Sequence, residues 1–223
     1  MSLQETLWWY AGNILDYTVE MLPCMAAALL LFLLLRPRRM ERLAEKGLVS
    51  GPVREAGLLL FVLFGAGLAA LTLFPAGFWR FQRWALVRRG ELPLFPPIDW
   101  HVQLHTIQMN PFQEILRAFR GPWVMFLMLA NIGIFAPVGF FSALLWRKGR
   151  WWKSMGIGFL TSFFIEFIQL FIGRSSDIDD ILLNTTGALA GYWLFWLLRA
   201  LFPKFTSKFQ CREREDTTNG LPD

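Results

Sequence analysis

The sequence predicts an all-α, polytopic membrane protein with about five transmembrane helices and further short helices at the extracytoplasmic surface. Hydrophobic residues make up 55% of the 223 residues and aromatic residues 16%, which is more apolar than an ordinary soluble domain. Five segments have the roughly 20 apolar residues that a helix needs to cross a hydrocarbon layer of about 30 Å. Lipid offers no partners for backbone N–H and C=O groups, so each segment is expected to be a helix. The five are 19–35, 56–74, 122–146, 154–173 and 181–202.

Residues 1–18 precede the first predicted span and are expected to lie in the membrane interface. Trp8, Trp9 and Tyr10 have the amphipathic rings that anchor a chain at that depth. Glu5, together with the lack of a basic start, argues against a cleavable signal peptide.

The basic residues predict which ends of the spans face the cytoplasm. Most of the 22 Lys and Arg residues follow the first, third and fifth spans, and short connections rich in Lys and Arg favour the cytoplasm. Five spans then place the N-terminus outside and the C-terminus inside. The net charge of +5 is therefore interpreted as a signal of orientation, and no nucleic-acid partner is expected.

The long connection between the second and third spans predicts surface structure. Its first part interleaves aromatic residues with arginines, a mixture that is typical of a helix lying among lipid headgroups. Residues 100–107 alternate apolar and polar side chains, which predicts a short extended segment. His101 and His105 have a spacing that would suit two metal ligands on a helix, but no third ligand lies nearby at a known spacing, so no metal is expected.

A helix is predicted just before the third span, packed as a lid on the outer ends of the spans. Asn110 is a suitable N-cap, Pro111 suits the first helical position, and Gln113 completes a capping-box pattern. Gly121 and Pro122 end this helix.

The remaining organisation is simple. Residues 19–203 form the membrane domain, and the tail 204–223 is polar, mixed in charge and predicted to be disordered. Within the fifth span, Gly187 and Gly191 form a GxxxG pattern, which is expected to let helices of the same chain pack closely.

Seven polar residues are the candidate ligand-binding site. Glu166 lies at a depth where a carboxylate costs several kcal/mol unless a partner or water neutralises it. Helical spacing and the predicted topology bring the seven to one depth, in the outer half of the membrane. They are Asn131, Glu166, Gln169, Arg174, Asp177, Asp180 and Asn184.

A purely structural interpretation of these residues is the alternative. Asp177 and Asp180 are favoured at a helix N-terminus, and Asn131 and Gln169 can join helices by hydrogen bonds worth about 1 kcal/mol each. Arg174 would then bridge carboxylates and hold the last two spans together, as in a scaffold protein.

Four short pieces of sequence occur in a fixed order between Asn110 and Tyr192. They are Asn110-Pro-Phe112, Asn131-Ile-Gly-Ile-Phe-Ala-Pro137-Val-Gly139, Glu166-Phe-Ile-Gln169 and Arg174-Ser-Ser-Asp177-Ile-Asp-Asp180-Ile-Leu-Leu-Asn184-Thr-Thr-Gly187. Together they resemble the VanZ-like family of bacterial membrane proteins, whose namesake is associated with low-level resistance to the lipoglycopeptide teicoplanin. The resemblance implies a protein of the cell envelope in the bacterial cytoplasmic membrane.

The function expected from these features is binding or modification of a surface lipid, a lipid-linked cell-wall headgroup or a lipoglycopeptide. Arg174 would meet a phosphate or carboxylate. The alternative is an enzyme acting on lipid-linked envelope precursors, with Glu166 as general base and a divalent cation at Asp177 and Asp180. No cofactor is expected, and the sequence does not predict an oligomeric state. A transporter is the least supported class, because five spans give no even internal repeat.

Overall fold

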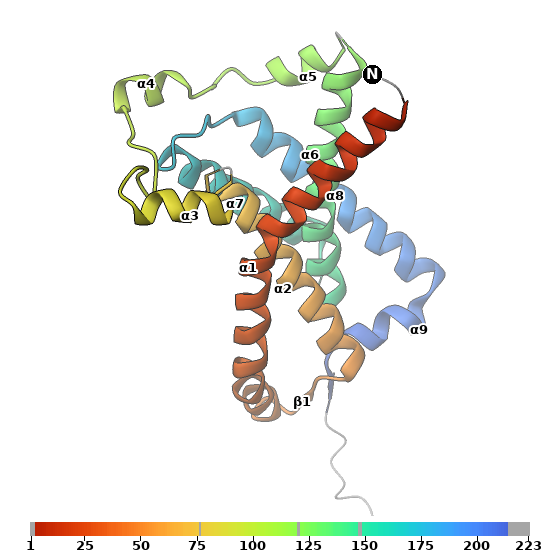
Figure 1. Cartoon of the computed structure of the whole chain (residues 1–223). Coiled ribbons are helices and arrows are strands. Elements are labelled where there is room, and N and C mark those ends of the chain that lie inside the picture. Colours follow the sequence, from red (N-terminus) through yellow and green to blue (C-terminus); the bar gives the residue numbers. More distant parts are fainter. Residues whose placement is uncertain (1–2, 76, 120, 147–148, 214–223) are drawn as a thin grey trace, which may run out of the picture.

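The computed structural model describes residues 3–75, 77–119, 121–146 and 149–213, and five long helices dominate it (Figure 1). They are α1 (Leu3–Ala44), α2 (Pro52–Thr72), α6 (Pro122–Leu145), α7 (Trp151–Leu170) and α8 (Ile178–Leu201). The prediction of an all-α fold is confirmed. The only sheet among the described residues pairs two-residue strands, β1 (Leu48–Val49) and β2 (Arg212–Glu213), in antiparallel register.

Each of the five predicted spans corresponds to one long helix, but composition supports four of them as membrane-crossing. In the described part of the chain, Leu15–Ala44, Pro52–Thr72, Val124–Leu145 and Ile178–Leu201 are long and apolar enough to cross a membrane. The remaining long helix, α7, is not among these four. It carries Lys153, Glu166 and Gln169, which lower its hydropathy.

The first helix extends further than predicted in both directions. It begins at Leu3 and ends at Ala44, so the N-terminal segment continues directly into the first span. The side chains of Trp8, Trp9 and Tyr10 lie outside the described residues, and their anchoring role stays a prediction.

The C-terminal tail packs beside the connection between α1 and α2. Residues 203–213 lie mostly in the predicted disordered tail, yet they form α9 (Pro203–Thr206), the 3-10 turn η1 (Ser207–Phe209) and β2. Phe209 explains this order: it stacks edge-on with Phe205 at 5.3 Å and lies against Gly57, where an added Cβ would be 2.8 Å from its ring. The prediction of disorder is therefore corrected for 204–213, whereas 214–223 lie outside the described residues.

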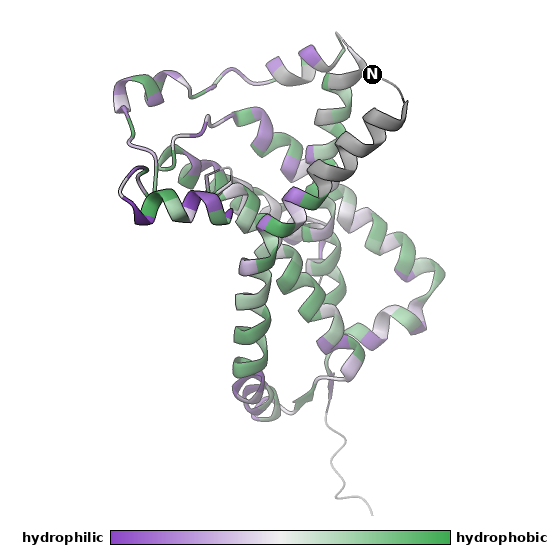
Figure 2. Cartoon of the chain, in the orientation of Figure 1, coloured by the Kyte–Doolittle hydropathy of each residue, from purple (hydrophilic) through white to green (hydrophobic). Residues whose placement is uncertain are grey.

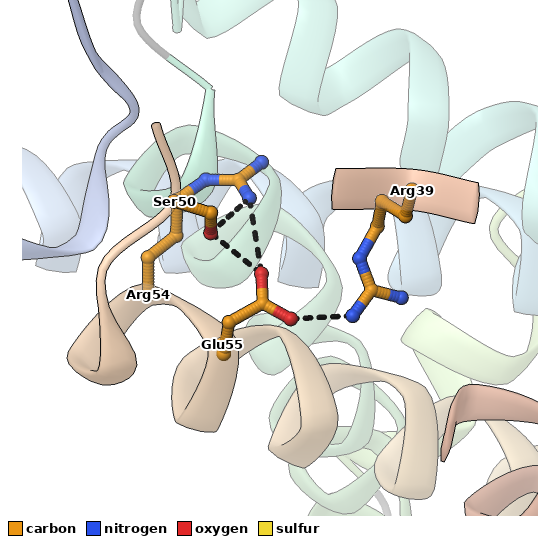
Figure 3. Close-up of polar contacts among 4 residues, drawn as sticks. All are labelled: Arg39, Ser50, Arg54 and Glu55. Carbon is orange, nitrogen blue, oxygen red and sulfur yellow. Dashed lines mark hydrogen bonds and ion pairs between the residues drawn. The ribbon is translucent and has the colours of Figure 1, made fainter. Parts of the chain in front are cut away.

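A polar network joins α1 to α2 at the same end of the molecule (Figure 3). Arg39 on α1 forms an ion pair with Glu55 on α2, which also accepts a hydrogen bond of 2.5 Å from the Ser50 hydroxyl. Arg54 donates to that hydroxyl at 3.0 Å. Figure 2 shows how hydrophilic this end of α1 is compared with the apolar stretch above it. The basic connections that follow α1 and α8 thus lie together.

Close contact between α6 and α8 forms the centre of the fold. An added Cβ on Gly191 would lie 1.8 Å from the carbonyl oxygen of Ala136, and one on Gly187 would lie 2.2 Å from that of Ile132. Gly139 on α6 approaches Ala188 equally closely, at 1.7 Å from its carbonyl oxygen. The prediction that Gly187 and Gly191 allow close packing within one chain is confirmed.

The connection between α2 and α6 forms three short helices (Figure 1). They lie away from the end of the molecule at which β1 pairs with β2, which we call the strand end. They are α3 (Phe81–Arg88), α4 (Trp100–His105) and α5 (Gln113–Ala118). The helix predicted from interleaved aromatic residues and arginines is α3. The prediction of an extended segment at 100–107 is wrong. A helix begins there instead, capped by Asp99, whose side chain accepts hydrogen bonds from the backbone N–H groups of His101 and Val102.

The predicted start of the lid helix is also corrected. α5 begins at Gln113, and its N-cap is Phe112 in the left-handed region at φ 70°, so Asn110 is not the cap and Pro111 lies outside the helix.

Candidate functional site

Six of the seven predicted site residues line one cavity of about 320 Å³. The cavity lies at the level where α2 ends and α7 turns into α8, and α1 and α6 complete its walls. Phe64, Leu68 and Ile165 supply apolar surface. The six polar residues are Asn131, Glu166, Gln169, Arg174, Asp180 and Asn184.

Asp177 is the predicted site residue that does not line the cavity. It is the N-cap of α8, where its side chain accepts the backbone N–H of Asp179 at 2.9 Å. Its own backbone N–H donates to Oε2 of Glu166 at 3.0 Å. Asp177 therefore shapes the turn and orients Glu166 rather than facing the cavity.

Glu166 is held by the turn that follows its own helix. The side chain is only 4% exposed, and its bond from the Asp177 N–H satisfies one carboxylate oxygen. The turn itself is fixed by Gly173, which has the left-handed φ of 74°, and by the Arg174 N–H donating to the Gln169 carbonyl at 3.1 Å. A buried carboxyl group is thereby aimed at the cavity.

Arg174 binds the end of α2 instead of a carboxylate. Its Nη1 donates to the carbonyl oxygen of Leu71 at 2.9 Å, one of the carbonyls that the last turn of a helix leaves unpaired. Among the described residues it forms no ion pair, so the prediction that Arg174 bridges carboxylates is wrong. The guanidinium lines the cavity together with the carboxyl groups of Glu166 and Asp180, but no described carboxylate forms an ion pair with it.

Three amide side chains join helices: Asn131 and Gln169, as the structural interpretation predicts, and also Asn184. Asn131 on α6 donates to Oδ1 of Asp180 on α8 at 2.8 Å. Gln169 on α7 donates to the Thr72 carbonyl at the end of α2 at 3.3 Å. Asn184 on α8 donates to the Ser162 hydroxyl on α7 at 2.9 Å. Each bond uses the amide nitrogen, which fixes the side chain beside the cavity.

Sequence reasoning missed two residues that hold this region together. Asp179 is completely buried, and its Oδ1 accepts the backbone N–H of Phe112 at 2.6 Å. Gln103, which is also buried, donates to the carbonyl of Arg174 at 2.6 Å. Asp179 stands in a run of aspartates that is plain in the sequence. The prediction omitted it because only residues on the same helical face as Asp177 and Asp180 were selected, and Asp179 is not on that face.

The described residues contain no cluster of three or more His, Cys, Asp and Glu side chains close enough to hold a metal ion. His101 and His105 are exposed on α4, with ring centroids 5.2 Å apart.

Comparison with known proteins places this site in a recognised family region. A family model described as VanZ/LLP1 matches residues 61–199. That range runs from α2 to α8 and contains all seven predicted site residues. Neither the curated proteins nor the solved structures gave a match.

Proposed function

The chain belongs to the VanZ/LLP1 family of membrane proteins, and we propose that it acts in the bacterial cell envelope by binding or modifying a surface lipid or lipid-linked headgroup. The observation that carries this proposal is the guanidinium of Arg174, which forms no ion pair with a described carboxylate, at a cavity that Glu166, Asp180 and three amides also line. A phosphate or carboxylate group fits that charge, and guanidinium geometry suits both.

The other polar groups suit the rest of a headgroup. The nitrogen atoms of Asn131, Gln169 and Asn184 are used in bonds between helices, so their carbonyl oxygens are placed to accept bonds from hydroxyl groups. Glu166 can accept as well. An anionic group near Arg174 with hydroxyl groups beside it matches a phosphorylated sugar or glycerol headgroup.

The orientation proposed for the membrane places this cavity on the outer side. β1 and β2 pair at one end of the molecule, so an even number of the helices between them must cross the membrane. α2, α6 and α8 qualify by composition, and α7, with 20 residues, is about 30 Å long at 1.5 Å per residue. Because the strand end carries the basic residues, it is proposed to be cytoplasmic, and the cavity then faces outward.

A susceptibility experiment tests the proposed function and its link to drug resistance. Cells expressing the wild type, Glu166→Ala, Arg174→Ala or the control Arg88→Ala at equal membrane levels are compared for susceptibility to a lipidated and a non-lipidated glycopeptide. We expect protection against the lipidated drug that both cavity variants lose and the control on exposed α3 keeps. Equal protection by all four proteins would contradict a role of the cavity in resistance.

An enzyme acting on lipid-linked precursors is the second candidate, favoured by the burial of the Glu166 carboxyl at the cavity. A general base must reach the proton that it removes, and a substrate bound at Arg174 would lie beside Glu166. Turnover of a prenyl-phosphate substrate by the wild type, lost in Glu166→Gln while binding is kept, would support this candidate over simple binding.

A further inference from the structure

A second, apolar cavity lies beside the polar one. It has a volume of about 310 Å³ and lies between α2, α6 and α7. Phe64, Leu68 and Ile165 line both cavities, so the two adjoin along these three side chains. Thr161 is the one residue with a polar side chain in the apolar lining.

The apolar cavity extends from the level of the polar cavity toward the strand end. Leu71 and Thr72, at the end of α2, line the polar cavity, whereas Phe61, nearer the start of α2, lines the apolar one. Phe61 and Leu73 both line the apolar cavity, and the rise between them is about 18 Å at 1.5 Å per residue. One leaflet of the hydrocarbon layer is about 15 Å thick, half of its ~30 Å.

We infer that the apolar cavity holds the hydrocarbon chain of the same molecule whose anionic headgroup meets Arg174. This inference rests on the proposed function and names the ligand class more closely, as a long-chain amphiphile with a phosphate or carboxylate headgroup. Its headgroup lies in the polar cavity and its chain in the apolar one, on the two sides of the wall that Phe64, Leu68 and Ile165 form.

The lining explains how such a chain is admitted. Gly65 is exposed on α2, and an added Cβ there would meet no atom within 4 Å. Phe164 on α7 is also exposed, so the cavity opens sideways between α2 and α7. A chain can therefore enter from the lipid without crossing the polar cavity, while its headgroup stays at the membrane surface.

Substitutions at the opening separate chain binding from headgroup binding. Gly65→Leu adds a side chain at the lining where a Cβ meets no atom within 4 Å, and Ala69→Leu, one turn further along α2, is a second variant designed to fill the cavity. Gly133→Leu is the matched control, because Gly133 is exposed on α6, has nothing within 4 Å of an added Cβ and lines neither cavity.

The experiment measures equilibrium binding of radiolabelled hexadecyl phosphate and butyl phosphate to the full chain in phosphatidylcholine nanodiscs, with empty nanodiscs subtracted. We expect Gly65→Leu and Ala69→Leu to weaken hexadecyl phosphate binding about tenfold, as displacement of two or so buried methylene groups would. Butyl phosphate binding should not change in these variants, and Gly133→Leu should bind both ligands as the wild type does. Arg174→Ala should weaken the binding of both ligands.

The outcomes distinguish this inference from the proposed function. Unchanged hexadecyl phosphate binding in both filling variants overturns the inference, and the proposed function stands if Arg174→Ala weakens binding. Hexadecyl phosphate binding that is not saturable in the wild type, or that Arg174→Ala leaves unchanged, contradicts the proposed function and the inference with it.

Discussion

The backbone N–H of Phe112 donates a hydrogen bond of 2.6 Å to Oδ1 of Asp179, which is completely buried. This bond joins two stretches of the family region that are far apart in the sequence: the Asn110-Pro-Phe112 piece and the first turn of α8. Phe112 has φ 70°, a conformation that costs about 1–2 kcal/mol for a residue with a side chain. Asp179 thus holds a strained backbone in place and sets where the connection ahead of α6 meets the turn beside the cavity.

Replacement of Asp179 by alanine should destabilise the protein more than replacement by asparagine. Asp179→Ala removes the buried acceptor of the Phe112 N–H, and loss of a hydrogen bond to a charged group costs about 1–3 kcal/mol. Asp179→Asn keeps an oxygen in that position and should lose less. The thermal unfolding midpoint in detergent, measured for both variants, checks the order. Equal midpoints for Asp179→Ala and the wild type would show that the bond to Phe112 contributes nothing to stability.

Contact between α6 and α8 predicts a strong size limit at Gly191. Gly191→Ala places a Cβ 1.8 Å from the Ala136 carbonyl oxygen, so the helices must separate, and overpacking of this kind typically costs about 1–3 kcal/mol. Gly133→Ala is the control, since an added Cβ there meets no atom within 4 Å and alanine is the better helix former. Folded yield and unfolding midpoint should fall for Gly191→Ala only. A fall of the same size in the control would point to glycine at any helical position rather than to helix contact.

Glu55 is expected to contribute to stability because two arginine side chains form ion pairs with its carboxylate. Arg39 pairs with it directly and Arg54 approaches it at 3.6 Å, while Arg54 and Glu55 are both buried. Glu55→Gln leaves two guanidinium groups close together without their carboxylate, so we expect a loss of about 1–3 kcal/mol. Glu41→Gln, at an exposed position on α1, should have little effect.

The salt dependence of this variant separates charge from packing. Repulsion between exposed groups is screened by salt, whereas an uncompensated buried charge is screened much less. The unfolding midpoint of Glu55→Gln should therefore stay below that of the wild type at high salt. Full recovery by salt would mean that the network acts as a surface ion pair.

Hydropathy predicted the long helices because a backbone inside lipid must form its own hydrogen bonds, which a helix does. The same reasoning failed where short-range chemistry competes. Residues 100–107 alternate like a strand, yet Asp99 supplies two side-chain hydrogen bonds that start a helix. The apparent capping box at Asn110 was likewise overridden, because Phe112 turns left-handed to reach Asp179.

The sequence predicted which polar residues would lie close together but not how they are connected. Six of them line one cavity, and they were selected because each is a polar residue within a predicted span or at the turn between the last two spans, a signal that needs no structure. The partner of Arg174 is the carbonyl of Leu71, more than a hundred positions away in the sequence, and backbone carbonyls carry no sequence signal. The order of the tail was missed for a similar reason: Phe209 packs against α2, a contact that a polar composition conceals.

Membrane orientation is the prediction on which the location of the cavity depends, and cysteine labelling tests it. With Cys24 replaced by Ser, a membrane-impermeant maleimide should leave native Cys211 unlabelled in intact cells and label it after permeabilisation. A cysteine introduced at exposed Gln82 on α3, in a chain with Cys211→Ser, should label in intact cells. The pairing of β1 with β2 requires Cys211 and the connection after α1 to share one side. Labelling of both Cys211 and the cysteine at 82 from outside would therefore place both ends of α2 on one side, so α2 would not cross the membrane and the proposed orientation of the cavity would be wrong.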